Sequence, residues 1–141
     1  MPRIKLLRDV VLTARRCKSL EKSCVYVLVA DTKVQYPKGK SRIVYIGQTQ
    51  KQGLKRIARS AALRANVIFG LHGTFGTVIQ FDARVMTCGG TDETMGRLEG
   101  TVLTCFEEVF GGLPVCNSNR HQPDLDHFRR ERIKIILEEL S

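Results

Sequence analysis

The sequence contains no tryptophan, and aromatic residues make up only 6% of it. Long hydrophobic runs are also missing. The longest unbroken apolar run covers residues 24–30, far short of the roughly 20 residues that cross a bilayer as a helix. Near the N-terminus the apolar residues are interrupted by Asp9, Thr13 and Arg15, which excludes the continuous apolar core of a secretory signal peptide. We therefore expect neither membrane insertion nor secretion.

Paired cysteine motifs are absent as well. The five cysteines stand at positions 17, 24, 88, 105 and 116, an odd number with no C-x-x-C motif. Unpaired thiols are typical of reducing compartments, so the sequence predicts a cytoplasmic protein without disulfides. An Arg-rich amphipathic N-terminus also occurs in organellar presequences, but Asp9 and Glu21 argue against that alternative because presequences contain few acidic residues.

Acidic residues are scarce in the first half of the chain. Residues 1–64 hold 16 lysines and arginines against three acidic residues, whereas residues 65–141 hold seven against eleven. The formal net charge of the whole chain is +9. A strongly basic half favours a polyanionic partner, nucleic acid before membrane. The alternative is a basic, solvated surface that has no such partner.

A length of 141 residues and an apolar fraction of 43% fit one globular domain. The residue patterns predict an α+β fold, in which a small, mostly antiparallel sheet of three strands is flanked by helices, with extra helices at the N- and C-terminus. We divide the single domain (1–141) into an N-terminal helical extension (1–22), a core (24–119) and a C-terminal helix (124–141). Helices are expected at 4–16, 53–65, 93–110 and 124–140, and strands at 24–30, 42–47 and 73–86.

Local signals set these boundaries. The Val-rich residues 24–30 and 42–47 favour two strands, and the polar residues 31–41 between them predict a basic, eleven-residue loop that closes an antiparallel hairpin. Gly111 and Gly112 end the helix at 93–110. Asp124 is the expected N-cap of the last helix. That helix is expected to turn inward a set of apolar residues, namely Leu125, Phe128, Ile135 or Ile136, and Leu140.

Two strand sequences carry the main functional signal. They are "CVYVL" from residue 24 and "VYIGQT" from residue 44, and the second leads into "LKRIARS" on a basic helix. This arrangement resembles the GIY-YIG nuclease superfamily, which has one tyrosine on each strand of a hairpin, then a helical Arg, a Glu on a later helix and an Asn after it. The matching positions lie within residues 24–119 and are Tyr26, Tyr45, Arg56, Glu99 and Asn117.

The chain departs from the family pattern at three positions. Cys24 and Val25 replace the first glycine and isoleucine, and Ser60 stands one helical turn after Arg56, where many members have histidine. A glycine-to-cysteine change within a strand is easily accommodated. The departures therefore bear on the proton chemistry more than on the fold.

The resemblance implies a metal-dependent DNA endonuclease that hydrolyses phosphodiester bonds by water attack. Arg56 would clamp the scissile phosphate, because a guanidinium offers forked donors that match phosphate oxygens. Glu99 would hold Mg²⁺ or Mn²⁺, since a carboxylate is a hard oxygen ligand. By the resemblance Tyr26 is the general base and Tyr45 positions the water, although the residues alone do not separate these roles. Asn117 would hold its loop against the site.

Other residues compete for some of these roles. Arg59 is a rival of Arg56, Glu107 and Glu108 share the expected helix of Glu99, and Asn119 lies close to Asn117. A metal site built from the three histidines with Cys116 and Asp124 lacks the spacing of a structural zinc set. Flanking phosphates are expected to contact a group of basic residues, namely Lys33, Lys38, Lys40, Arg42, Lys55, Arg59 and Arg64.

The expected partner is DNA, with no membrane and no small-molecule cofactor. Cleavage of both strands at one sequence would need two active sites, which makes a homodimer possible. A second hypothesis is a nucleic-acid-binding domain on the same scaffold that does not cleave. A third is a protein-interaction domain, which predicts no salt-sensitive DNA binding.

Overall fold

The computed structural model describes residues 1–20, 22–50, 53–72, 79–86 and 92–141. The elements run in the order β1 (Cys24–Tyr36), β2 (Gly39–Thr49), α1 (Gly53–His72), β3 (Phe81–Met86), α2 (Asp92–Phe110) and α3 (Arg130–Leu140). The three strands form one antiparallel sheet in the order β2-β1-β3, so β2 is an edge strand. This confirms the predicted α+β class and the three-stranded antiparallel sheet.

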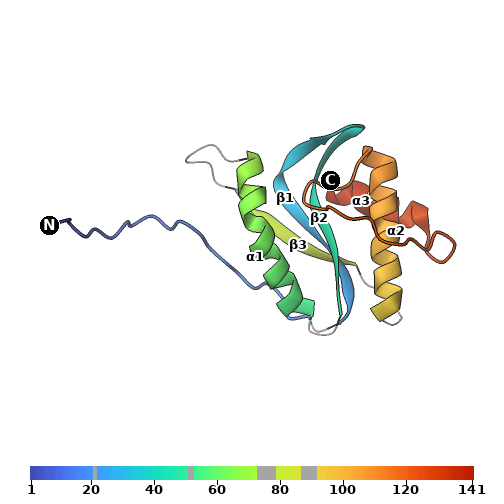
Figure 1. Cartoon of the computed structure of the whole chain (residues 1–141), viewed down its shortest axis with the longest axis horizontal. Coiled ribbons are helices and arrows are strands. Elements are labelled where there is room, and N and C mark those ends of the chain that lie inside the picture. Colours follow the sequence, from blue (N-terminus) through green and yellow to red (C-terminus); the bar gives the residue numbers. More distant parts are fainter. Residues whose placement is uncertain (21, 51–52, 73–78, 87–91) are drawn as a thin grey trace.

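Helices cover both faces of the sheet (Figure 1). The alternation of side chains along β1 sends Val25 and Val27 toward α2 and α3, and Tyr26 and Leu28 toward α1. The core on the α2 side includes Phe106 and Leu137, and the smaller core on the α1 side includes Ile57 and Ile68. None of the described helices is long and apolar enough to cross a membrane.

The β1–β2 hairpin differs from its prediction. The eleven-residue loop expected at 31–41 is instead a continuation of both strands, which a short turn at Pro37 and Lys38 connects. Residues 31–36 have the alternation of a strand, since Tyr36 is buried and Val34 half-buried between exposed Lys33 and Gln35. An irregularity in register between Val29 and Val34 accommodates the polar residues there.

The N-terminal helix predicted at 4–16 is wrong. Residues 1–20 have no helix or strand, and residues 1–19 run away from the domain as an extended, exposed segment (Figure 1). Its large apolar side chains, Ile4 and Leu7 among them, are exposed. A helix of about 13 residues is marginal in water without packing, and nothing in the described chain covers its apolar stripe. The apolar period of residues 4–16 therefore predicted a helix where the chain is extended.

The remaining helices agree with the prediction to different degrees. α2 ends at Phe110 as expected, with Gly111 in the left-handed region (φ 83°) and its N–H on the Glu107 carbonyl oxygen. α1 continues past the predicted end at residue 65 to His72. α3 begins at Arg130 instead of following Asp124, whose carboxylate accepts the His127 N–H in a local turn.

Inward-facing residues of α3 also differ from the expected set. Ile133 and Leu137 are buried, Phe128 and Leu140 are partly buried, and Leu125 and Ile135 are exposed. The third strand covers 81–86 of the predicted 73–86, and residues 73–78 lie outside the described residues.

Candidate active site around the edge strand

The two motif tyrosines meet at Gly47. Tyr26 on β1 pairs directly with Gly47 on β2, and the ring centroids of Tyr26 and Tyr45 lie 5.9 Å apart. A Cβ at position 47 would stand 2.6 Å from the Tyr26 Cζ and hydroxyl oxygen and 2.7 Å from Cε1 of Tyr45. Glycine is therefore needed at this position so that the Tyr26 ring can lie against the backbone of β2.

Two side chains of α1 complete this group. The Tyr26 hydroxyl donates to Ser60 Oγ (2.5 Å), and Nη1 of Arg64 donates to the same oxygen (3.1 Å). The Arg64 guanidinium carbon lies 3.8 Å from the centroid of the Tyr45 ring, a close cation–π contact. We call Tyr26, Tyr45, Ser60 and Arg64 the phenol cluster.

Burial decides the charge state of Tyr26. The side chain is only 2% exposed, and loss of solvation raises its pKa to about 12, although the Ser60 hydrogen bond and Arg64 act in the opposite direction. The phenol is therefore neutral near pH 7 and serves as a hydrogen-bond donor. A general-base role for Tyr26, as the resemblance implies, finds no support in this environment, and Tyr45 is the more exposed phenol.

The arginine of the cluster is Arg64, whereas the sequence pattern favours Arg56. Arg56 is exposed and makes none of the hydrogen bonds or ion pairs found in the described chain; its rival Arg59 is exposed too. Arg64 stands eight residues later on α1, about 12 Å along the axis at about 1.5 Å per residue. Helical spacing could have indicated Arg64, because residues 56, 60 and 64 lie on one side of a helix.

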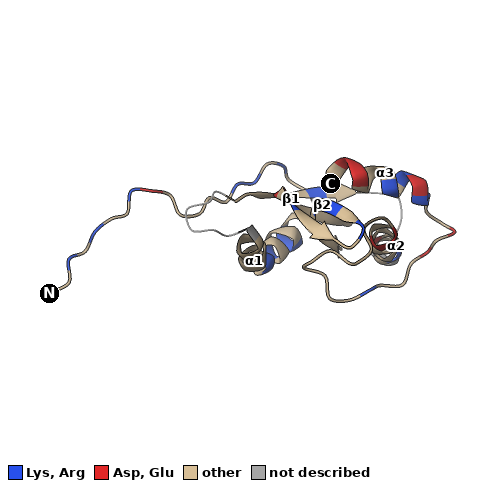
Figure 2. Cartoon of the chain, turned by 90° about the horizontal axis from the view of Figure 1, so that it is seen from above, with Lys and Arg blue, Asp and Glu red and all other residues tan. Residues whose placement is uncertain are grey.

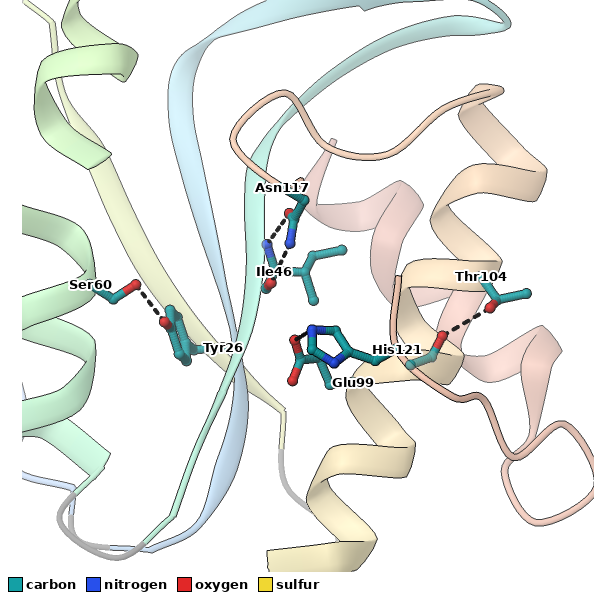
Figure 3. Close-up of polar contacts among 8 residues, drawn as sticks. Tyr26, Ile46, Ser60, Glu99, Thr104, Asn117 and His121 are labelled. Carbon is teal, nitrogen blue, oxygen red and sulfur yellow. Dashed lines mark hydrogen bonds and ion pairs between the residues drawn. The ribbon is translucent and has the colours of Figure 1, made fainter. Parts of the chain in front are cut away.

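Glu99 lies on the other side of β2, on α2 (Figure 3). It is 4% exposed, and its Oε1 lies 3.2 Å from Nε2 of His121, whose side chain is 48% exposed. Burial raises the pKa of the Glu99 carboxyl, while the nearby His121 imidazole lowers it. The buried carboxylate is thus covered by a histidine that lies at the surface.

The rival glutamates of α2 are engaged elsewhere. Glu107 forms an ion pair with Arg120, and Glu108 pairs with Arg130 and with Lys134 (2.7 Å). The hydrogen bond from Lys134 holds the pKa of the Glu108 carboxyl below its usual value. These ion pairs lie at the surface and engage both carboxylates. Glu99 is the better metal-ligand candidate of the three.

Asn117 fastens the segment after α2 to the edge strand. Its side-chain oxygen accepts the Ile46 N–H and its amide donates to the Ile46 carbonyl oxygen, both at 2.9 Å (Figure 3). The Cys116 N–H bonds the Val44 carbonyl oxygen in the same way (2.9 Å). Asn117 thus satisfies an open backbone edge next to Gly47, which gives the residue a structural role, whereas Asn119 is exposed.

The basic residues assigned to flanking phosphates spread over a wide area (Figure 2). Lys33 lies seven residues along β1 from Tyr26, about 23 Å at about 3.3 Å per residue. That distance corresponds to about seven base pairs of B-DNA at about 3.4 Å each. Lys38 lies farther still, in the turn, where it packs against the end of α2. These lysines can reach only DNA that extends well beyond the tyrosines.

Comparison of the chain with protein-family models, curated proteins and solved structures finds no match. The described residues contain no cluster of three or more His, Cys, Asp or Glu side chains that could hold a metal ion. Four of the five cysteines fall in that part of the chain and are free thiols. Function is therefore inferred from the phenol cluster and from Glu99.

Gly47→Ala should lower the free energy of unfolding by about 1–3 kcal/mol, the usual cost of overpacking a tight site. The added methyl group would force the Tyr26 ring away from β2 and from Ser60. Urea unfolding measures the effect. Gly70→Ala is the matched control: a Cβ there meets nothing within 4 Å, and alanine in a helix should stabilise the chain by about 0.5–1 kcal/mol. A Gly47→Ala protein as stable as the wild type would contradict the close approach.

Proposed function

We propose that this chain is a metal-dependent DNA endonuclease of the GIY-YIG type that hydrolyses phosphodiester bonds by water attack. The observation that carries the proposal is the phenol cluster, in which a guanidinium stacks on one motif tyrosine next to a second, buried one. Two motif positions, Tyr26 and Tyr45, meet there, and the guanidinium that joins them belongs to Arg64 of α1 instead of the motif residue Arg56. The buried carboxylate of Glu99 on the other side of the same edge strand adds a candidate metal ligand.

Each group suits one task in phosphodiester hydrolysis. Arg64 is the proposed phosphate clamp, because its forked donors match two phosphate oxygens and stay charged at any working pH. The Arg64 side chain is half-buried, and its Nε is buried without a hydrogen-bond partner within the described chain. Tyr45, half-buried under Arg64, is the group proposed to orient the attacking water.

Tyr26 and Ser60 serve as support in this proposal. The neutral Tyr26 phenol and Arg64 both bond Ser60 Oγ, so one hydroxyl fixes the buried phenol and the guanidinium together. Ser60 stands where many family members have histidine, and it is 6% exposed. Its proposed role is therefore to position Arg64, with no direct part in proton transfer.

The chemistry of Glu99 fits a hard divalent cation. The carboxyl group is buried, and burial raises its pKa. A bound cation would offset this unfavourable desolvation of the carboxylate. When bound, Mg²⁺ or Mn²⁺ would supply Lewis-acid stabilisation of the charge that develops on the phosphate and the leaving oxygen. Glu99 would hold the ion, and Arg64 would act on the phosphate itself.

A non-catalytic nucleic-acid-binding domain is the second candidate. The observation that favours it is the cover of His121 over Glu99, because a carboxylate 4% exposed offers little open coordination space. The basic residues on the β1–β2 hairpin and α1 would then bind phosphates without cutting (Figure 2).

Nicking of supercoiled plasmid separates the two candidates. We expect the wild-type chain to convert supercoiled plasmid to open circles in Mg²⁺ or Mn²⁺ and to stop when EDTA is added. A gel-shift series over 50–200 mM salt measures DNA binding in parallel. Salt-sensitive binding without nicking in either metal would overturn the nuclease proposal in favour of the binding domain. A chain that neither binds nor nicks DNA would exclude both candidates.

A further inference from the structure

His121 lies against Glu99, although the two residues are 22 positions apart and the proposed hydrolysis assigns no role to the imidazole. The carboxylate oxygen and Nε2 stand 3.2 Å apart on the α2 side of β2 (Figure 3). Two ligands at right angles around one ion, each about 2.1 Å from it, are about 3.0 Å apart. The pair therefore already has the separation of two neighbouring ligands of a single cation.

The segment that carries His121 is held directly against α2. A Cβ at Gly100 would stand 2.3 Å from the Gln122 carbonyl oxygen and 2.9 Å from that of His121, so the backbone crosses the helix where α2 has no side chain. Farther along, the Asp124 N–H donates to Thr101 Oγ1 (2.9 Å). These contacts fix the position of His121 through its backbone, independently of the contact with Glu99.

A second oxygen donor faces the same part of α2. The side-chain amide of Gln48 on β2 lies against Gly96, with Nε2 3.6 Å and Oε1 3.8 Å from the position of an added Cβ. Gly96 precedes Glu99 by three residues, so the two positions are neighbours on one face of the helix. Gln48 Oε1 is buried and has no hydrogen-bond partner among the described residues. A buried acceptor without a donor costs free energy, and a bound cation would satisfy it.

We infer that the metal site of the proposed nuclease has two protein ligands, the Glu99 carboxylate and the His121 imidazole, with the Gln48 amide oxygen facing the same ion. The inference rests on the proposed function, because the site is that of the proposed nuclease. Metal binding can still be measured without DNA. A nitrogen ligand shifts preference away from Mg²⁺, which takes oxygen ligands, toward Mn²⁺ and later first-row ions. We expect Mn²⁺ to bind more tightly than Mg²⁺ for this reason.

Electron spin-echo modulation of bound Mn²⁺ tests the inference on the full chain without DNA. The wild-type spectrum should show coupling to ¹⁴N from the imidazole, and His121→Gln should abolish it. His121→Gln should also weaken Mn²⁺ binding, followed by calorimetry, by at least about tenfold. His127→Gln is the matched control, because His127 is exposed and its ring contacts Phe128; it should keep both the coupling and the affinity.

Several outcomes would overturn the inference while leaving the nuclease proposal standing. Bound Mn²⁺ without ¹⁴N coupling would show that His121 is not a ligand. Equal or tighter Mn²⁺ binding by His121→Gln would show that the imidazole only covers the carboxylate and has to move away before the metal binds. Absence of Mn²⁺ binding to a wild-type chain that nicks plasmid in Mg²⁺ would also refute it. The half-exposed His121 side chain makes its replacement tolerable for folding, and circular dichroism checks this.

Discussion

Arg64→Met should lower the single-turnover rate of DNA nicking by about 100- to 1000-fold, the usual effect of removing one preorganised donor to developing charge. Methionine keeps most of the length of the side chain but can neither stack as a cation on Tyr45 nor bond Ser60, as Arg64 does. Arg56→Met should cost less than about tenfold, because the exposed Arg56 would add only a phosphate contact outside the site. Nicking rates at one fixed salt concentration compare the two variants.

Arg64→Lys provides the control for charge. Lysine keeps the positive charge but loses the planar fork, so its nicking rate should fall between those of the wild type and Arg64→Met. Urea unfolding of each variant separates a loss of rate from a loss of structure. A larger loss in Arg56→Met than in Arg64→Met would contradict this account and return the phosphate clamp to the position that the family resemblance implies.

Glu99→Gln should reduce nicking by at least about 1000-fold and at the same time stabilise the fold near neutral pH. The loss of rate follows from losing the metal ligand, since Lewis-acid stabilisation contributes several kcal/mol and each 1.36 kcal/mol changes the rate about tenfold. The gain in stability follows from the raised pKa of the Glu99 carboxyl in the folded chain. Thermal unfolding without metal, followed from pH 4 to pH 8, measures the second effect.

The direction of the pH effect comes from proton linkage. A carboxyl whose pKa is higher in the folded chain is favoured there in its protonated form, so stability is lost as pH rises from its ordinary pKa through the raised one. Glutamine stays neutral and removes this loss. Glu107→Gln is the control: the surface pair with Arg120 contributes little, so nicking and stability should both change slightly. A Glu99→Gln protein that nicks plasmid at the wild-type rate would remove Glu99 from the site.

Secondary structure was predictable where the local signals and the tertiary packing agree. The apolar period of α2 and its glycine end predicted both limits of that helix closely. The N-terminal segment has the same kind of period but no partner to bury it, and so it is not a helix. Charged and polar residues hid the continuation of β1 through 31–36, because exposed strand positions accept them and only the buried Tyr36 and the half-buried Val34 mark the alternation.

The site was predictable in part for a similar reason. Sequence spacing placed Tyr26 and Tyr45 on adjacent strands, and the structure brings them together over Gly47. Sequence spacing could not decide which arginine of α1 joins the tyrosines, because that depends on how the helix packs against the sheet. His121 reaches α2 because the backbone after that helix crosses it at Gly100, and Gln48 of β2 reaches α2 at Gly96. No spacing rule describes these two contacts.

We propose that the phenol cluster and Glu99, on two sides of β2, act on a single phosphate. A crystal structure of the chain with a short DNA duplex and Ca²⁺, which substitutes for the working ion, is the decisive test. We expect one backbone phosphate that contacts both the Arg64 guanidinium and the cation held by Glu99, next to Tyr45. A duplex bound elsewhere, or a cation and a guanidinium on different phosphates, would contradict it.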